Sequence, residues 1–191
     1  MYTKYQTDAL VLRSYERGEA DRVFALYTRE FGFVWARASA VRRERSKMRY
    51  ALQNYSVSSV SLVRGNRGWR IAGARAHVGV DAQKTNASMA IARIAGLVER
   101  LVIGEEKNGY LFATLTEAHA ALLRESKESH GAIELLCVAR VLYALGYVSA
   151  EALGTALFSH TAYALPELTE AEAARAKLLS SVNKALSETH L

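Results

Sequence analysis

The sequence predicts an α+β protein in which a five-stranded β-barrel, residues 1–80, is followed by an α-helical bundle, residues 81–191. Up to residue 78, short runs of alternating apolar residues are separated by glycine-marked turns, which is typical of a small barrel. From about residue 85, apolar residues recur every three or four positions, which is typical of helices. Charge changes at the same place: residues 1–76 hold fifteen Lys and Arg against six Asp and Glu, and residues 77–191 hold ten against thirteen.

The barrel strands are expected where β-prone runs lie between turn sequences such as "ERGEAD" and "GNRG". These runs are residues 8–15, 22–28, 33–41, 55–65 and 68–78. The connection at 42–54 is longer than a hairpin needs. Its "SKMRYALQ" predicts one or two helical turns that close one end of the barrel.

Four helices are expected in the second domain. The first follows the apolar spacing of Ile91, Ile94 and Val98, with Gly104 as its C-terminal cap, and the second runs from about residue 110 to 124. The third, "AIELLCVARVLYALGY", is apolar nearly all round and is expected at the centre of the bundle. The "TEAE" of residues 169–172 has the pattern of a capping box and predicts the start of the last helix.

The connection "AVRRERSKMRY" is the most basic part of the chain. Like charges on one loop repel one another, so an anion that neutralises them is expected, and nucleic acid is the commonest polyanion. The alternative is a solvated loop with no ligand. The residues expected to contact phosphates are Arg42, Arg43, Arg45, Lys47 and Arg49, with Arg64, Arg67 and Arg70 as a second edge.

Aromatic residues are concentrated in the same half, with eleven of seventeen before residue 77. Strand alternation places Phe33, Trp35 and Arg37 on one face. Single-stranded nucleic acid is held by a positive groove and by aromatic faces on which bases stack, and oligonucleotide-binding (OB) barrels use a strand face in this way. Trp35 and Arg37 are therefore nucleic-acid candidates. The alternative, that the aromatic side chains fill the barrel core, stays open for Trp35, and Phe24 is expected inside.

No catalytic site is expected. The five histidines are scattered, whereas zinc needs four convergent ligands, so neither a metal nor another cofactor is predicted. Cys137 lies in the most apolar helix and is read as a buried structural thiol. No nucleophile, base and orienting group come together, which indicates a protein that is not an enzyme.

The compartment is expected to be the cytoplasm, in association with the nucleoid. The sequence "MYTKYQTDAL" lacks the pattern of a signal peptide, and charged residues interrupt every apolar stretch before it could span a bilayer. A single cysteine is consistent with a reducing compartment.

Two segments, "ALVLRSYERGEADRVFALYTREFG" and "VRRERSKMRYALQNYS", resemble the N-terminal domain of the bacterial recombination-repair family RecO. The matching positions are Gly18, Glu19, Asp21, Arg22, Thr28, Gly32, Ser46, Leu52 and Gln53. The chain departs from the family pattern at Ser39–Ala40, where Lys-Gly is usual, and at Asn54, where proline is usual. It also lacks the four zinc-binding cysteines that many members carry after the third helix, so this is a short form without zinc.

The resemblance implies a non-enzymatic recombination mediator that binds single- and double-stranded DNA, anneals strands and assists recombinase loading. It also implies two protein partners, RecR and the acidic C-terminal tail of single-strand-binding protein. Such a tail would dock beside basic residues of the helical domain, for which the candidates are Arg93, Arg100 and Arg140. Core packing is an equally good reading of each of these three arginines.

Two other functions stay open at this stage. One is an OB-fold module that binds RNA or the ribosome, because phosphate contacts are common to DNA and RNA. The other is a helical scaffold whose basic loop meets an acidic protein.

Overall fold

The computed structural model describes residues 3–78, 85–153 and 155–189. The chain forms two compact units. The first contains residues 1–82 together with 101–109, and the second contains residues 83–100 together with 110–191. In the parts that the structure describes, no helix is both long and apolar enough to cross a membrane.

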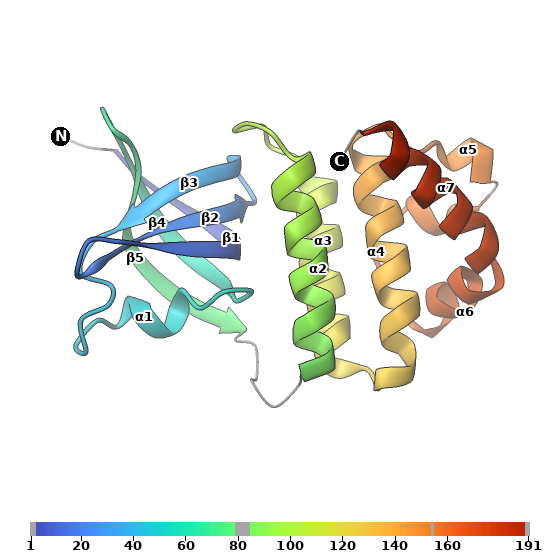
Figure 1. Cartoon of the computed structure of the whole chain (residues 1–191), viewed down its shortest axis with the longest axis horizontal. Helices are drawn as coiled ribbons and strands as arrows, with labels where there is room; N and C mark the ends of the chain where they lie inside the picture. The colour runs from blue at the N-terminus through green and yellow to red at the C-terminus, as the bar shows by residue number, and fades with distance from the viewer. Residues whose placement is uncertain (1–2, 79–84, 154, 190–191) are drawn as a thin grey trace. The chain divides into compact units, whose positions relative to one another are not determined.

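The first unit is a closed barrel with strand order β1-β2-β3-β5-β4 (Figure 1). Its strands are β1 (Lys4–Arg17), β2 (Asp21–Thr28), β3 (Gly32–Ala38), β4 (Val57–Gly65) and β5 (Gly68–Val78). All neighbours are antiparallel except β3 and β5, which are parallel and share a short register, Ala36 with Trp69 and Arg37 with Arg70. The predicted fold class, a five-stranded barrel followed by helices, is confirmed.

The barrel interior is filled by the alternate apolar residues of each strand, because successive strand side chains point to opposite faces. Phe24 and Leu26 are fully buried in it, as expected for Phe24. The predicted helical turn is α1 (Met48–Ala51), which is followed by Leu52 (Figure 1). Leu52 is buried in the barrel core and Met48 packs against it, so this connection contributes to the core of the barrel.

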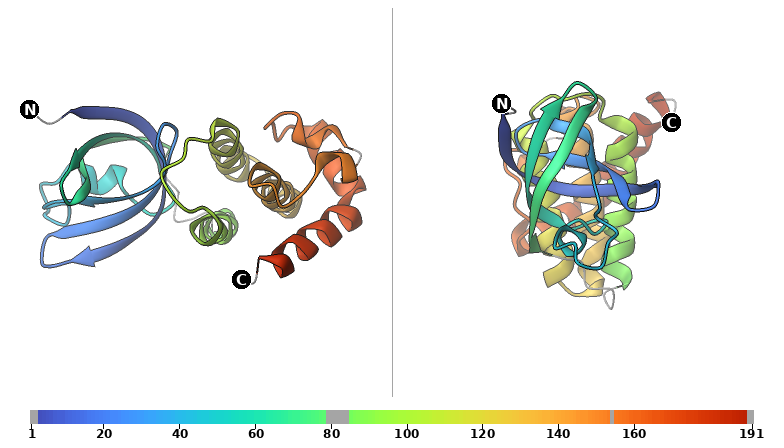
Figure 2. Two further views of the ribbon diagram at one scale, coloured as in Figure 1. Left: turned by 90° about the horizontal axis from the view of Figure 1, so that it is seen from above. Right: turned by 90° about the vertical axis from the view of Figure 1, so that its left-hand side faces the viewer.

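The second unit is helical. Its helices are α2 (Thr85–Leu101), α3 (Gly109–Arg124), α4 (His130–Ala144), α5 (Ala150–Leu153), α6 (Leu165–Ala173) and α7 (Arg175–Glu188), with short 3-10 helices η1 (Lys127–Ser129) and η2 (Ala156–Phe158). Helices α2, α3 and α4 run side by side (Figure 2). Nine of the fifteen residues of α4 are buried, as its all-round apolar sequence predicts.

Helix α4 ends in a Schellman motif at Gly146, which has a positive φ of 80°. The N–H of Tyr147 donates to Leu142 O at 2.8 Å, and the N–H of Gly146 donates to Tyr143 O at 3.0 Å. Glycine is suited to the left-handed backbone that this motif requires.

The predicted start of the last helix is wrong. The "TEAE" segment lies inside α6, where the Thr169 hydroxyl donates back to Leu165 O at 2.8 Å. Helix α6 instead begins after Ala164, whose N–H donates to Glu167 Oε2 at 3.1 Å, with Pro166 in the first turn. A break at Ala174 then separates α6 from α7.

Residues 101–109, which the sequence placed in the helical domain, pack with the barrel unit. Lys107 Nζ forms an ion pair with Glu30 at 2.7 Å. Gly32, with a φ of 60°, lies so close that a Cβ placed on it would be 2.1 Å from Glu106 O. This glycine therefore permits both the turn between β2 and β3 and the close approach of the segment.

Candidate nucleic-acid interface

The basic connection, residues 42–49, is called the strap here. It follows Ala40, whose φ of 55° lies in the left-handed region. The N–H of Arg42 donates to Ala20 O at 3.0 Å, which holds the start of the strap against the turn between β1 and β2. All five basic residues of the strap are exposed.

The strap charges face solvent for the most part. Arg43, Arg45 and Lys47 form no ion pair with any carboxylate that the structure describes. Arg42 is paired, with Nη1 at 3.2 Å from Glu16. The Arg49 guanidinium lies 5.2 Å from the centre of the exposed Tyr50 ring, so the strap also presents an aromatic face beside its charge.

A recess of about 210 Å³ lies beneath the strap, and we call it the strap recess. Its charged lining is Arg22, Arg42, Arg49 and Glu16, and its apolar lining is Phe24, Val41 and Leu52. Glu16 pairs with both Arg22, at 3.4 Å, and Arg42, and the carboxylate side chain is 58% exposed. Since three guanidinium groups share one accessible carboxylate, the recess keeps a positive charge.

A second recess, of about 400 Å³, lies beside the β4–β5 turn and is called the hairpin recess. Its lining residues are Arg17, Arg37, Val63, Gly65, Asn66, Arg67, Gly68, Trp69 and Arg70. Val63 and Trp69 are almost fully buried, whereas the four arginines are exposed. An apolar floor below a guanidinium rim suits a ligand with a planar ring and an anionic group, as in a nucleotide.

Asp21 fixes one rim of the hairpin recess. It accepts hydrogen bonds from Ala40 N, at 2.8 Å, and from Arg37 Nε, at 2.9 Å. The bond from Ala40, and then that from the Arg37 guanidinium, lower the pKa of Asp21 below its usual value. Asp21 therefore stays ionised and holds both Arg37 and the residue that leads into the strap.

An aromatic pair lies on the outer face of the strands that carry the hairpin recess. Trp35 is 43% exposed and stacks obliquely on Tyr15, with ring centres 5.6 Å apart. Arg13 covers Tyr15 at 4.3 Å, and Arg37 follows Trp35 on the same face of β3. Phe33 lies edge-on to Trp35 but is largely buried, so Trp35 is the accessible ring of the predicted face.

The three arginines predicted as a second phosphate-binding edge do not lie together. Arg67 and Arg70 join Arg37 in the hairpin recess. Arg64 does not line the recess: its guanidinium forms an ion pair with Glu105 at 2.9 Å and lies 5.1 Å from the centre of the Trp69 ring. The reason is that segment 101–109 packs on the barrel, which the local sequence around Arg64 does not reveal.

The sequence reading did not include Arg17, Tyr15 and Arg22. Tyr15 and Arg17 could have been found from the alternation in "RSYER", which places Arg13, Tyr15 and Arg17 on one face of β1. Arg22 pairs with Glu16 across the hairpin. Asp21 pairs with Arg37, which lies sixteen residues away.

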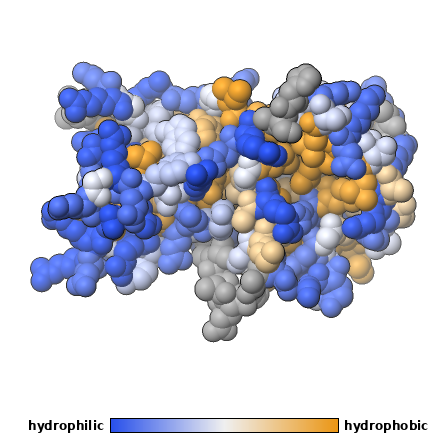
Figure 3. Space-filling view, in the orientation of Figure 1, coloured by the Kyte–Doolittle hydropathy of each residue, from blue (hydrophilic) through white to orange (hydrophobic). Residues whose placement is uncertain are grey.

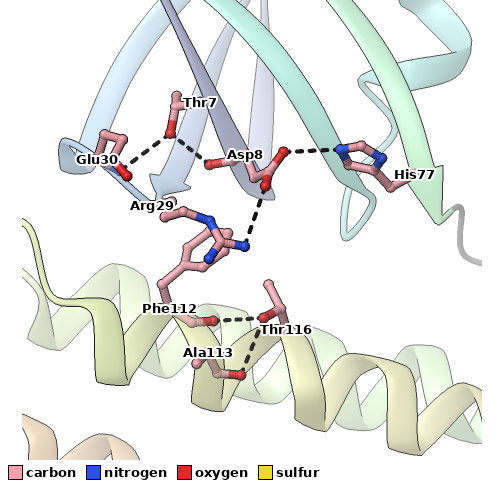
Figure 4. A network of polar contacts seen from close by, with 8 residues as sticks. All are labelled: Thr7, Asp8, Arg29, Glu30, His77, Phe112, Ala113 and Thr116. Atoms are coloured by element: carbon pink, nitrogen blue, oxygen red, sulfur yellow. Dashed lines mark hydrogen bonds and ion pairs between the residues drawn. The ribbon is translucent and has the colours of Figure 1, made fainter.

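Other basic residues of the barrel take part in structural contacts (Figure 4). The Asp8 carboxylate lies 3.0 Å from His77 Nε2 and 3.4 Å from Arg29 Nη2. The N–H of Glu30 donates to the Thr7 hydroxyl at 3.3 Å, which ties the β2–β3 turn to β1. Positive charge on the barrel surface is therefore not uniformly available to a ligand (Figure 3 shows the predominantly hydrophilic barrel surface on one face).

The three arginines considered for a protein partner differ in their surroundings. Arg140 is fully buried, donates to Leu157 O and Ala162 O at 2.8 Å each, and lies over the Tyr163 ring. It therefore ties α4 to the segment after η2, and this structural role corrects its assignment as a docking residue. Arg93 makes a two-pronged ion pair with Glu134, at 2.5 and 2.6 Å, and Arg100 is exposed without an ion pair to any described residue.

Cys137 is completely buried in α4. Burial raises the pKa of its thiol to about 12, so the group is a packed apolar side chain at neutral pH. Among the residues that the structure describes, no three His, Cys, Asp or Glu side chains gather as metal ligands would.

The family model "Recombination protein O N terminal" matches residues 1–73, which is the barrel. The barrel is therefore similar to the N-terminal domain of the RecO family. A 61-residue segment is 41% identical to the DNA repair protein RecO of Desulfitobacterium hafniense and to that of Pelotomaculum thermopropionicum. It is 38% identical to the RecO of Dehalococcoides mccartyi. The segment is 32% of this chain and only 22–24% of the length of these RecO relatives.

Proposed function

We propose that the RecO-type barrel binds DNA through its phosphates, and that the chain acts as a recombination mediator. In this role it anneals single strands and assists recombinase loading during DNA repair. The observation that carries the proposal is the strap, whose exposed Arg43, Arg45 and Lys47 have no ion-pair partner among the described residues. The protein would act in the cytoplasm at the nucleoid, where its substrate is.

Annealing requires no catalytic group. It requires that the charge of two strands be neutralised so that they can approach, and that base contacts be weak enough for pairing to displace the protein. Guanidinium and ammonium groups on an exposed strap satisfy the first condition, since phosphate contacts dominate affinity without reading sequence. The second condition favours few contacts to base edges, and we propose no catalytic residue, metal or cofactor.

We also propose RecR and the tail of single-strand-binding protein as partners. The tail is acidic, so an exposed arginine without an internal partner is the appropriate contact. Of the two exposed candidates, Arg100 meets this condition better than Arg93, because Glu134 already occupies the Arg93 guanidinium. Exchange of Arg100 for Glu should weaken capture of a synthetic tail peptide, and Arg124→Glu serves as an exposed control.

The test of the proposed function is annealing of complementary strands over a series of salt concentrations, with and without single-strand-binding protein. The logarithm of the binding constant should fall with the logarithm of salt concentration at a slope near −3.5 if all five strap cations contact one strand, at about −0.7 per contact. A slope near −2 would indicate that only three cations, such as Arg43, Arg45 and Lys47, contribute. Accelerated annealing is the expected result, and failure to bind DNA in dilute buffer would overturn the proposal.

Variants separate this function from its alternatives. Exchange of Arg43, Arg45 and Lys47 for Ala should weaken DNA binding and make the salt slope shallower by about 2, whereas Arg124→Ala with Arg175→Ala removes two arginines of the helical unit and should change neither. Unchanged DNA affinity in the strap variant would favour a scaffold that binds an acidic protein. A strong preference for an RNA strand over a DNA strand of equal sequence would favour an RNA-binding module.

A further inference from the structure

The two recesses lie on opposite faces of one β-hairpin. At the end of the β1–β2 hairpin the cross-strand pairs are Glu16 with Arg22 and, next to it, Arg17 with Asp21. Successive residues of a strand point to opposite faces of the sheet. Glu16 and Arg22 therefore face the strap recess, whereas Arg17 and Asp21 face the side of the hairpin recess.

The neighbouring residues of β2 and β3 support this assignment of the two faces of the hairpin. Phe24 follows Arg22 on the same face of β2, lies in the barrel core and lines the strap recess. On the other face, Val23 pairs with Arg37 of β3, and Arg37 pairs with Arg70 of β5, which places both arginines in the outer surface. Arg17, Arg37 and Arg70 therefore line the hairpin recess from the outer face of the sheet, although the floor residue Trp69 belongs to the barrel core. Glu16, Arg22 and Phe24 line the strap recess from the core-facing side of the hairpin.

The two recesses have the same chemistry. Each has exposed guanidinium groups around an apolar floor, and each has an aromatic ring nearby, Tyr50 beside the strap recess and Trp35 beside the hairpin recess. Glu16 is the one carboxylate among the lining residues of the strap recess, and the lining of the hairpin recess contains none, although Asp21 holds its rim residue Arg37. Arginines are therefore in excess in both. Either recess has what a segment of single strand needs: cations for phosphates and an aromatic face for a base.

We propose that the barrel holds two polynucleotide strands at once, one in each recess, with the β1–β2 hairpin between them. This proposal rests on the proposed function and gives it a geometry. Strands that repel each other in solution would be brought to one protein with guanidinium groups on both sides of the hairpin. The β1–β2 turn at Gly18 has a φ of 64°, and a Cβ placed there would have no neighbour within 4 Å, so side chains do not crowd the end of the hairpin at this point.

The test is the stoichiometry of a short oligothymidylate of about eight nucleotides, a length within the range for one OB-type site. The intact protein should bind about two such strands, and one strand labelled with a donor dye should transfer energy to another labelled with an acceptor. Thymidylates do not pair with each other, so energy transfer requires that both strands occupy one protein.

Two double variants assign the sites. Arg67→Ala with Arg70→Ala should empty the hairpin recess, and Arg42→Ala with Arg49→Ala should empty the strap recess. Each should leave about one bound strand, remove the energy transfer and slow annealing, with the affinity of the remaining site within about twofold of its original value. The control, Arg124→Ala with Arg175→Ala, should keep two strands.

The outcomes separate the two proposals. A single strand per protein, with affinity reduced in both double variants, would mean that one strand passes around the hairpin end, which overturns the two-strand proposal and leaves DNA binding intact. Absence of binding by the intact protein would overturn the proposed function itself. Circular dichroism of each variant establishes that a lost site does not reflect an unfolded barrel.

Discussion

Asp21 accepts hydrogen bonds from the Arg37 guanidinium on one carboxylate oxygen and from the Ala40 N–H on the other. One carboxylate thus connects the start of β2, the end of β3 and the residue that leads into the strap. We expect Asp21→Asn to lower the melting temperature and to raise the affinity for single-stranded DNA, because Arg37 gains freedom to contact phosphates. Lower affinity together with a native melting temperature would contradict this role.

The hydrogen bonds of the Asp21 carboxylate make the stability of the protein depend on pH. The pKa of Asp21 is lowered in the native state, so its contribution to stability is present above the ordinary carboxyl pKa of 3.8 and is lost as the pH falls through the native value. Between pH 5 and pH 3, the urea midpoint of the native protein should therefore fall more than that of Asp21→Asn. Equal falls would mean that other carboxylates account for the acid sensitivity.

Ala40 occupies a backbone conformation that favours glycine. Its φ of 55° costs an L-residue about 1–2 kcal/mol, and glycine escapes this cost. We expect Ala40→Gly to raise the free energy of unfolding by about 1 kcal/mol, because the N–H bonded to Asp21 is retained. Urea denaturation measures the change. Ala76→Gly, at an exposed position of β5 without a positive φ, should instead destabilise the barrel by about 0.5–1 kcal/mol.

The barrel and its basic surface were predictable because they depend on local pattern. Strand alternation identified every strand, and it placed Trp35 and Arg37 on one face, whose exposure the structure then established. The charge of the strap was visible in eight consecutive positions. These features follow from residues that are near one another in the sequence, where periodicity and turn chemistry are informative.

What the sequence reading missed depends on contacts between distant residues. Arg64 was grouped with Arg67 and Arg70, but Glu105 lies beside it in space at a separation of forty-one residues. Arg140 was a candidate for docking and equally for core packing, and the structure buries it with hydrogen bonds to the carbonyl groups of Leu157 and Ala162. A guanidinium can satisfy its donors with backbone carbonyls, so burial of an arginine does not require an acidic partner that the sequence would reveal.

Gly32 and Gly18 both have a positive φ, of 60° and 64°, but only Gly32 is crowded. Exchange of either for Ala should cost about 1–2 kcal/mol for the backbone alone. In Gly32→Ala the new Cβ would also collide with Glu106 O, so segment 101–109 should leave the barrel. We expect faster trypsin cleavage after Lys107 in Gly32→Ala and not in Gly18→Ala. Equal cleavage would contradict the packing of this segment on the barrel.

Trp35 and Trp69 are the two tryptophans of the chain, and only Trp35 is exposed. Since stacking of one base contributes about 1–3 kcal/mol, Trp35→Ala should weaken binding of single-stranded DNA about 5- to 150-fold. Single strands should also quench the fluorescence of the native protein, and this quenching should be reduced in Trp35→Phe to the part that comes from Trp69. Tyr147→Ala removes an aromatic ring of equal exposure from the helical unit and should leave both readouts unchanged.

The reactivity of the Cys137 thiol reports on the packing of the interior of the helical unit. Because burial raises the pKa of its thiol from 9.0 to about 12, the thiol should resist a disulfide reagent until the protein unfolds. Above pH 9 the unfolded chain loses the thiol proton while the native state keeps it, so stability decreases as the pH rises. Between pH 8 and pH 10 this loss should be about 1.4 kcal/mol greater in the native protein than in Cys137→Ala, measured by urea denaturation. Rapid labelling of the folded protein would instead show that α4 opens locally, since no direct path leads from solvent to a completely buried sulfur atom.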